Sequence, residues 1–309
     1  CRRSPFHREP RFRAKSTAIA PSVKHSTIAG AITWILAELV MLVWDPNRSW
    51  VGPAMLVYVL LLWLVVAAIV REDRAAEQSA LAASATGTRL WLRIGIILAT
   101  LFAVFMVYSV WYVGYVRLPW LGGILRGYNA FFGPTFGQPL FNFTLYAVLP
   151  GTLLFALGMH RNEVGLTRSA PCTWEAALPC LALPTVFVAL ALYRGTLTVG
   201  FLATLVVRNF FSNGFSEEFL IRGMTLSHLR ACMRTPWALF AQAVVFSLLH
   251  YGAVSRQEHG NAILIVANVI AENFPTAFAL GLVALRTRSL ALPTMLHISF
   301  DIMGNFVGL

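Results

Sequence analysis

The stretch Ser216–Arg222 holds the residues of this chain that are best placed to do chemistry, two adjacent carboxylates and an arginine between long apolar runs. On a helix, Glu218 and Arg222 are four residues apart, in the order that favours a side-chain ion pair. Glu217 projects about 100° away around such a helix and is left without that partner. The spacing therefore predicts one paired carboxylate and one carboxylate that is available for chemistry.

The apolar surroundings of these charges bear on whether they have a function. An ionisable group at the centre of a membrane helix costs about 2.5–3.5 kcal/mol on insertion scales, so such groups are functional candidates by default. The alternative is that the charges lie at a helix end and are solvated at the membrane surface. Further polar residues inside other apolar runs weigh against that alternative.

The first of these residues is His250, which follows Phe246 by four positions. A lone histidine near a helix end is more often interfacial than catalytic. However, the basic turn at Arg234 lies sixteen residues after Glu218 and sixteen before His250. If the two helices form a hairpin at this turn, glutamate and histidine stand at equal depth, ~24 Å of helix from the turn.

His297 and Asp301 are four residues apart and share one face of the last apolar segment. The pair can be a simple hydrogen bond that satisfies both groups in lipid. It can also be an oriented imidazole, because a carboxylate partner determines which ring nitrogen carries the proton. The pair alone leaves both interpretations open.

Glu38, Arg208 and Glu272 also interrupt apolar runs. For each glutamate, the sequence is equally consistent with a hydrogen bond to a neighbouring helix and with a functional role. Arg208 can extend its side chain to the membrane surface. The four cysteines show neither metal-ligand spacing nor a disulfide framework. These residues therefore receive no chemical role.

The composition identifies the elements that must position the candidate residues. Of the 309 residues, 58% are hydrophobic and 12% are charged, whereas a soluble domain has about 25% charged residues. The net charge of +11 does not indicate nucleic-acid binding, because the basic residues lie mostly in a basic N-terminal tail and in gaps between apolar runs. The chain is predicted to be an integral membrane protein whose surroundings are the lipid bilayer.

Apolar runs of roughly the length that crosses a bilayer as a helix recur along the whole chain. We expect an all-α, polytopic membrane helix bundle with about eight to nine transmembrane segments. The nine runs are 28–44, 51–70, 91–116, 140–159, 176–193, 198–212, 237–252, 261–284 and 289–309.

The gaps between these runs alternate in basic content, which places the N-terminus in the cytoplasm by the positive-inside rule. All but two of the 24 basic residues are arginine, which favours a GC-rich bacterial genome and hence the bacterial plasma membrane. Because residue 1 is Cys, we expect the natural start to lie upstream. The glycines of 117–139 predict a loop or re-entrant segment, and the polar stretch 72–88 predicts a linker or surface helix.

Three regions follow from this pattern. Residues 1–26 are expected to be a basic disordered cytoplasmic tail, residues 27–197 the N-terminal membrane helices, and residues 198–309 the membrane core that holds the candidate chemistry.

Together the motifs resemble those of the CAAX protease and bacteriocin-processing (CPBP, or ABI) family of intramembrane glutamate proteases. That family carries EExxxR on one helix, FxxxH on the next, and HxxxN or HxxxD on a later one. The resemblance covers about 198–309, and the first half of the chain shares only its hydrophobicity. The matching residues stand in that order as Glu217-Glu218…Arg222, Phe246…His250 and His297…Asp301.

The resemblance implies that Glu217 is the base that activates water, with His250 assisting. His297 and Asp301 would stabilise the oxyanion, and Glu218 and Arg222 would support the site. Peptide hydrolysis without a covalent intermediate needs such a base and such donors. Many members of the family have Asn at the position of Asp301. An ionised Asp cannot donate a hydrogen bond, so Asp301 is expected either to be protonated or to orient His297, and we favour orientation.

The resemblance thus implies an intramembrane endopeptidase that acts on a peptide or protein near the membrane and needs no cofactor. A catalytically silent scaffold or chaperone of the same fold is the first alternative. A proton-coupled transporter is disfavoured because the sequence shows no inverted repeats. Zinc is possible but not favoured, since the two histidines lie on separate segments without HExxH spacing. The substrate and the oligomeric state do not follow from the sequence.

Overall fold

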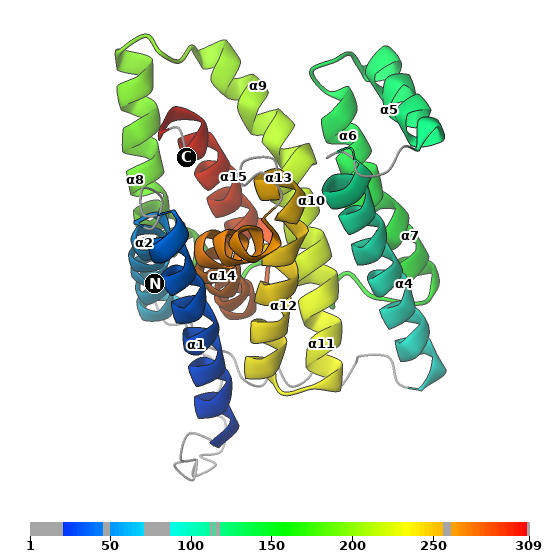
Figure 1. Ribbon diagram of the computed structural model, residues 1–309, viewed down its shortest axis with the longest axis vertical. Coiled ribbons are helices and arrows are strands. Elements are labelled where there is room, and N and C mark those ends of the chain that lie inside the picture. Colours follow the sequence, from blue (N-terminus) through cyan, green and yellow to red (C-terminus); the bar gives the residue numbers. More distant parts are fainter. Residues whose placement is uncertain are drawn as a thin grey trace, which may run out of the picture.

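The structure is a computed structural model that describes residues 21–45, 50–70, 87–111, 114, 118–255 and 261–307. Every regular element in these ranges is helical (Figure 1). The α-helices are α1 (Pro21–Trp44), α2 (Val51–Ile69), α4 (Thr88–Phe105), α5 (Pro119–Phe132), α6 (Gly137–Phe143), α7 (Leu149–Ala156), α8 (Thr173–Tyr193), α9 (Val199–Asn209), α10 (Phe215–Glu218), α11 (Ser227–Cys232), α12 (Thr235–Leu249), α13 (Tyr251–Ser255), α14 (Ala262–Thr287) and α15 (Ala291–Val307).

Four π-helical segments continue or join these α-helices. They are η1 (Met106–Trp111), η2 (Thr144–Val148), η3 (Phe210–Gly214) and η4 (Phe219–Leu226). As a result, α9, η3, α10, η4 and α11 follow one another without a break from Val199 to Cys232, which we call the motif helix.

Seven helices within the described residues are long and apolar enough to cross a membrane, in agreement with the predicted all-α polytopic bundle. Two of the nine expected segments fall outside these seven. The segment expected at 198–212 is part of the longer motif helix, which carries Glu217, Glu218 and Arg222. The last segment, α15, has 17 residues. The motif helix is not among the seven because the site residues interrupt its apolar composition, and α15 is not among them because it is short.

Two local expectations are corrected by the structure. Helix α1 begins at Pro21, inside the tail expected over 1–26, and proline with its fixed φ is favoured in the first helical turn. The loop or re-entrant segment expected over 117–139 contains α5, which begins at Pro119 and ends before Gly133, whose φ is +78°, so the stretch is not simply a loop. Residues 1–20 and most of the stretch 72–88 lie outside the described residues.

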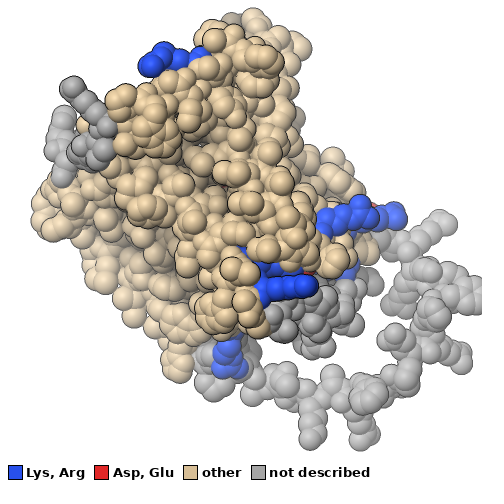
Figure 2. All heavy atoms as spheres, turned by 90° about the vertical axis from the view of Figure 1, so that its right-hand side faces the viewer, with Lys and Arg blue, Asp and Glu red and all other residues tan. Residues whose placement is uncertain are grey.

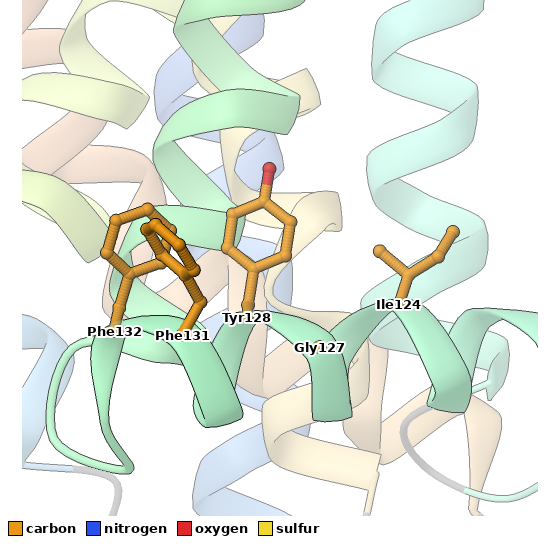
Figure 3. A pocket seen from close by; sticks show the side chains of 5 residues that line it. All are labelled: Ile124, Gly127, Tyr128, Phe131 and Phe132. Atoms are coloured by element: carbon orange, nitrogen blue, oxygen red, sulfur yellow. The ribbon is translucent and has the colours of Figure 1, made fainter.

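Helix α5 is anchored to the bundle by one of its faces. The Tyr128 hydroxyl donates to Thr144 Oγ1 over 3.0 Å, and the Tyr128 ring packs edge-on against Phe141. Figure 3 shows Ile124, Tyr128, Phe131 and Phe132 projecting from the same side of α5, where they line a pocket. This apolar face explains why the glycine-rich stretch folds as a helix.

The outside of the bundle is apolar, as a lipid-facing surface requires. Leu64, Trp91 and Phe102 are each more than half exposed. Figure 2 shows the face that carries α4, α5 and α7, where Lys and Arg side chains stand at the top edge and in the lower half, with a broad band free of charge between them. Such a band is the pattern expected of a membrane-embedded surface.

The motif helix is surrounded by the rest of the bundle. Helix α14 packs against α1, α2 and α12, while α4, α6 and α7 form a group on the other side of the motif helix (Figure 1). Phe219, Leu220, Ile221 and Met224 of the motif helix are almost fully buried in the largest hydrophobic cluster. Both halves of the chain therefore contribute to the packing around the two glutamates.

The π-helical segments of the first half reach the second half close to the candidate residues. Segment η1 packs against α13, and segment η2 packs against α10 and η4. The Gly252 amide donates to Ser109 Oγ over 3.2 Å, and a Cβ at Gly252 would overlap the Tyr108 carbonyl oxygen. Because Gly252 lies two residues after His250, this contact holds the segment that carries the histidine.

Replacing Gly252 with Ala is therefore expected to force α13 away from η1 and to lower the stability of the protein. Overpacking of this kind typically costs about 1–3 kcal/mol. The control is Gly95→Ala in α4, where nothing lies within 4 Å of the added Cβ and where Ala is the better helix former. Thermal unfolding of the purified protein in detergent measures both variants, and equal unfolding temperatures would contradict the packing role of Gly252.

Candidate active site

The two glutamates reach the middle of the bundle because the motif helix and α12 form a hairpin. The motif helix ends at Cys232, Arg234 precedes the first residue of α12, and the turn lies at the lower end of Figure 1. Helix α12 then ascends beside the motif helix and ends at Leu249. The hairpin predicted from the Arg234 turn therefore forms, and it brings His250 to the level of the glutamates.

Glu217 is the meeting point of three elements. Its Oε2 atom lies 3.9 Å from His250 Nε2 at the end of α12 and 3.8 Å from His297 Nε2 on α15. These distances are too long for direct hydrogen bonds but short enough for a small molecule to contact the carboxylate and an imidazole together. The structure thus unites residues that lie up to 80 positions apart, from Glu217 to His297.

Glu218 has the opposite surroundings and is completely buried. Its Oε1 atom accepts a hydrogen bond from Arg222 Nη1 over 2.9 Å and another from His297 Nδ1 over 2.8 Å. The structure therefore shows the predicted division between the two glutamates. Glu218 pairs with Arg222, and Glu217 does not.

Arg222 is held by two further contacts that fix its guanidinium in the interior. Its Nη2 donates to the Ala277 carbonyl over 3.1 Å, and the guanidinium carbon lies 4.5 Å above the Phe246 ring. Gln242 donates to the same carbonyl over 2.9 Å. Arg222 therefore ties Glu218 to α14 as well as to its own helix.

The ring of His250 is oriented by the backbone of its own helix. Its Nδ1 lies 2.9 Å from the Phe246 carbonyl oxygen. A carbonyl only accepts, so Nδ1 carries a hydrogen and Nε2 of the neutral ring is left as an acceptor. That acceptor faces the Glu217 carboxylate.

Asp301 does not make the orienting contact that the sequence suggested. Its Oδ1 lies 3.9 Å from His297 Nε2, and its Oδ2 accepts from Asn213 Nδ2 over 3.2 Å. His297 Nδ1 is instead held by Glu218. The contact with Glu218 directs the His297 ring toward the motif helix, where its other nitrogen, Nε2, lies 3.8 Å from Glu217 Oε2.

Two residues of this cluster were missed by the sequence analysis. Asn213 positions Asp301, and Gln242 shares the Ala277 carbonyl with Arg222. Each is an amide inside an apolar segment and lies four residues before a motif residue, Glu217 or Phe246. This four-residue spacing on a helix is the feature of the sequence that could have identified both residues. Glu38 and Glu272 lie on α1 and α14, which carry none of the motif residues.

Exposure differs sharply across the cluster. The side chains of His250 and Asp301 are 28% and 23% exposed, whereas that of Glu218 is 0% exposed. A substrate can therefore approach along His250 and Asp301, while Glu218 and Arg222 lie behind them. The arrangement combines a proton acceptor, an imidazole acceptor and an imidazole held by a carboxylate, which is the equipment for acid–base chemistry on a bound molecule.

No group of three or more His, Cys, Asp and Glu side chains within the described residues has the geometry to hold a metal ion. The expectation that the site works without a cofactor stays a prediction.

Comparison with known proteins bears on the segment that holds all of these residues. The family model Rce1-like, described as type II CAAX prenyl endopeptidase Rce1-like, matches residues 199–303. No curated protein and no solved structure matches the chain significantly. The family match confirms the resemblance over a range that contains all three motifs, and at the level of the family it supports a CAAX-type intramembrane endopeptidase in a multi-pass membrane protein.

Glu218→Gln is expected to destabilise the protein strongly, because Arg222 and His297 would lose their anionic partner in the interior. Breaking one side of a buried ion pair typically costs about 3–5 kcal/mol. Glu217→Gln is the matched control, since Glu217 makes neither contact, and its unfolding temperature in detergent should stay near that of the wild type. Equal losses in the two variants would refute the division of roles between the glutamates.

Proposed function

Starting from the Rce1-like match of residues 199–303, we propose that this protein is an intramembrane endopeptidase in which Glu217 activates water to hydrolyse a peptide bond. The observation that carries the proposal is the position of Glu217 Oε2, which faces Nε2 of both His250 and His297 at 3.8–3.9 Å. The carboxylate and the two imidazoles thus surround one point from three helices.

The first step is removal of a proton from water. A water molecule at that point donates one hydrogen to Glu217 and the other to the acceptor Nε2 of His250. Its oxygen then attacks the carbonyl carbon of the scissile bond as Glu217 takes the proton. The Phe246 carbonyl supports this step because it keeps His250 in the accepting tautomer.

The second step is stabilisation of the oxyanion that forms on the carbonyl oxygen. His297 commits Nδ1–H to Glu218, so its Nε2 can donate only when the ring is doubly protonated. The carboxylates of Glu217 and Glu218 lie 3.8 and 2.8 Å from the nitrogens of that ring and stabilise its positive charge. A charged donor aimed at the oxyanion is among the strongest contributions to such a reaction.

The reaction ends when the tetrahedral intermediate collapses. The proton held by Glu217 passes to the leaving amine, the carbon–nitrogen bond breaks, and the carboxylate is regenerated. No covalent bond to the protein forms in this scheme. Glu218 and Arg222 act as positioning residues, because they fix His297 and the motif helix without touching the substrate.

The environment of the reaction follows from the topology. We place the N-terminus in the cytoplasm on the basis of the alternating basic gaps, and we assign the protein to the bacterial plasma membrane on the basis of its predominance of arginine over lysine. The substrate is a peptide or protein segment at the membrane, either a prenylated CAAX tail, as the family description suggests, or an unmodified leader-type peptide. A silent scaffold would carry the same fold and cleave neither.

The test of the proposed base is Glu217→Gln, which keeps the shape of the side chain but cannot take the proton. Cleavage of internally quenched peptides, one ending in a farnesylated CAAX sequence and one an unmodified leader, is followed with the purified full chain in nanodiscs. The variant should lose about 10²–10⁴-fold in kcat. The matched control is Glu272→Gln, the same change on α14, which should keep the wild-type rate.

More than about a tenth of the wild-type rate in Glu217→Gln would refute the role of Glu217 as the base. A wild-type protein that cleaves no peptide of either class would favour the scaffold instead.

Asp301→Asn separates the two roles considered for Asp301. Because Glu218 already orients His297, Asn at 301 should still accept from Asn213 and should add an amide donor beside the oxyanion. We therefore expect activity within about tenfold of the wild type across pH 6–9, since one neutral hydrogen bond contributes about 0.5–1.5 kcal/mol. A loss of tenfold or more would show that the negative charge of Asp301 is needed.

A further inference from the structure

Two of the polar contacts between the motif helix and α15 are offset by four residues on each helix. Glu217 faces His297 at 3.8 Å, and Asn213 donates to Asp301 over 3.2 Å. Moving four residues back along the motif helix corresponds to moving four residues forward along α15, so the two helices run antiparallel here. The next position on this face of the motif helix, four residues before Asn213, is Asn209.

Asn209 is a buried residue whose side-chain donor is unpaired in the part of the chain that the structure describes. Its side chain belongs to a residue that is 8% exposed, and its Nδ2 atom has no hydrogen-bond partner within the described residues. Its surroundings are apolar, since Leu205, one turn earlier, packs in a cluster with Ile298 and Ile302 of α15. Leaving such a donor unpaired costs about 1–3 kcal/mol, and buried polar groups in folded proteins are otherwise paired.

The position of Asn209 suggests what its partner is. Eight residues separate it from Glu217, which corresponds to ~12 Å along the helix. An extended peptide advances about 3.3 Å per residue, so a substrate whose scissile bond lies at Glu217 reaches Asn209 three to four residues away. A peptide offers carbonyl oxygens along its backbone and a carboxylate at its end, and both accept from an amide.

We propose that Asn209 forms a substrate subsite, in which its side-chain amide donates to a carbonyl or carboxylate oxygen of the bound peptide three to four residues from the scissile bond. The subsite rests on the proposed endopeptidase function. It makes cleavage depend on peptide length, because a shorter substrate leaves the Asn209 donor unpaired.

The test compares a core quenched peptide, with two residues on each side of the bond, with the same peptide extended to five residues on one side or the other. The full chain in nanodiscs cleaves them as wild type, Asn209→Leu and Thr204→Val. Leu has nearly the shape of Asn without its donor. Thr204 is the matched control, a polar residue of the same helix whose hydroxyl already donates to the Gly200 carbonyl over 3.0 Å.

For the wild type and for Thr204→Val, we expect kcat/KM for one extended peptide to exceed that for the core peptide by about five- to tenfold, as one hydrogen bond supplies. In Asn209→Leu this ratio should fall to about one. The unfolding temperature of Asn209→Leu should equal or exceed that of the wild type, because an apolar side chain replaces an unpaired buried donor.

Two further peptides identify the acceptor, and both of their outcomes support the subsite. If amidation of the peptide C-terminus removes the length preference, the acceptor is the terminal carboxylate. If the preference persists, the acceptor is a backbone carbonyl.

Four outcomes overturn the inference. A wild-type ratio retained in Asn209→Leu, or a wild type without length preference, removes the subsite while leaving the proposed function intact. A lower unfolding temperature of Asn209→Leu, with equal losses on core and extended peptides, assigns Asn209 a structural role. A wild type that cleaves none of the peptides overturns the proposed function, and the subsite with it.

Discussion

The burial of Glu218 is the constraint on which the rest of the site depends. A carboxylate with no exposed surface is costly unless charged donors surround it, and here the donors are Arg222 on its own helix and His297 on α15. Satisfying Glu218 therefore fixes the distance between the motif helix and α15. The same contacts set the place of His297 relative to Glu217, so the cost of burying one charge is offset by contacts that assemble the other groups.

The first half of the chain enters this assembly through its irregular helices. Segments η1 and η2 reach α13 and α10, and π-helical turns are often found at functional sites. Tyr108 donates to Asn142, which in turn donates to the Ser212 carbonyl of the motif helix over 3.5 Å. The family model matches only residues 199–303, yet the geometry of the matched core is supported by helices outside it.

The sequence predicted the helical class well because it follows from the lengths of the apolar runs. It predicted the hairpin at Arg234 because Glu218 and His250 are the same number of residues from that turn. It also predicted which glutamate pairs with Arg222, since a four-residue step on a helix is a local property. It did not predict that Glu218 rather than Asp301 holds His297, because that contact joins residues 79 positions apart. The helix of 119–132 was not specified because the glycines indicated a loop or a re-entrant segment, whereas the packing of Tyr128 on η2 and α6 stabilises a helix there.

The two histidines of the site differ in how easily a mutation can remove the group that orients each imidazole ring. His250 takes its orientation from the Phe246 carbonyl, a backbone group that every residue type at position 246 would supply. His297 takes its orientation from a single carboxylate, Glu218, which one nucleotide change can remove. A mutation elsewhere in the chain can therefore remove the group that orients His297 on α15. The backbone carbonyl that orients His250 at the end of α12 cannot be removed by exchanging the side chain at position 246.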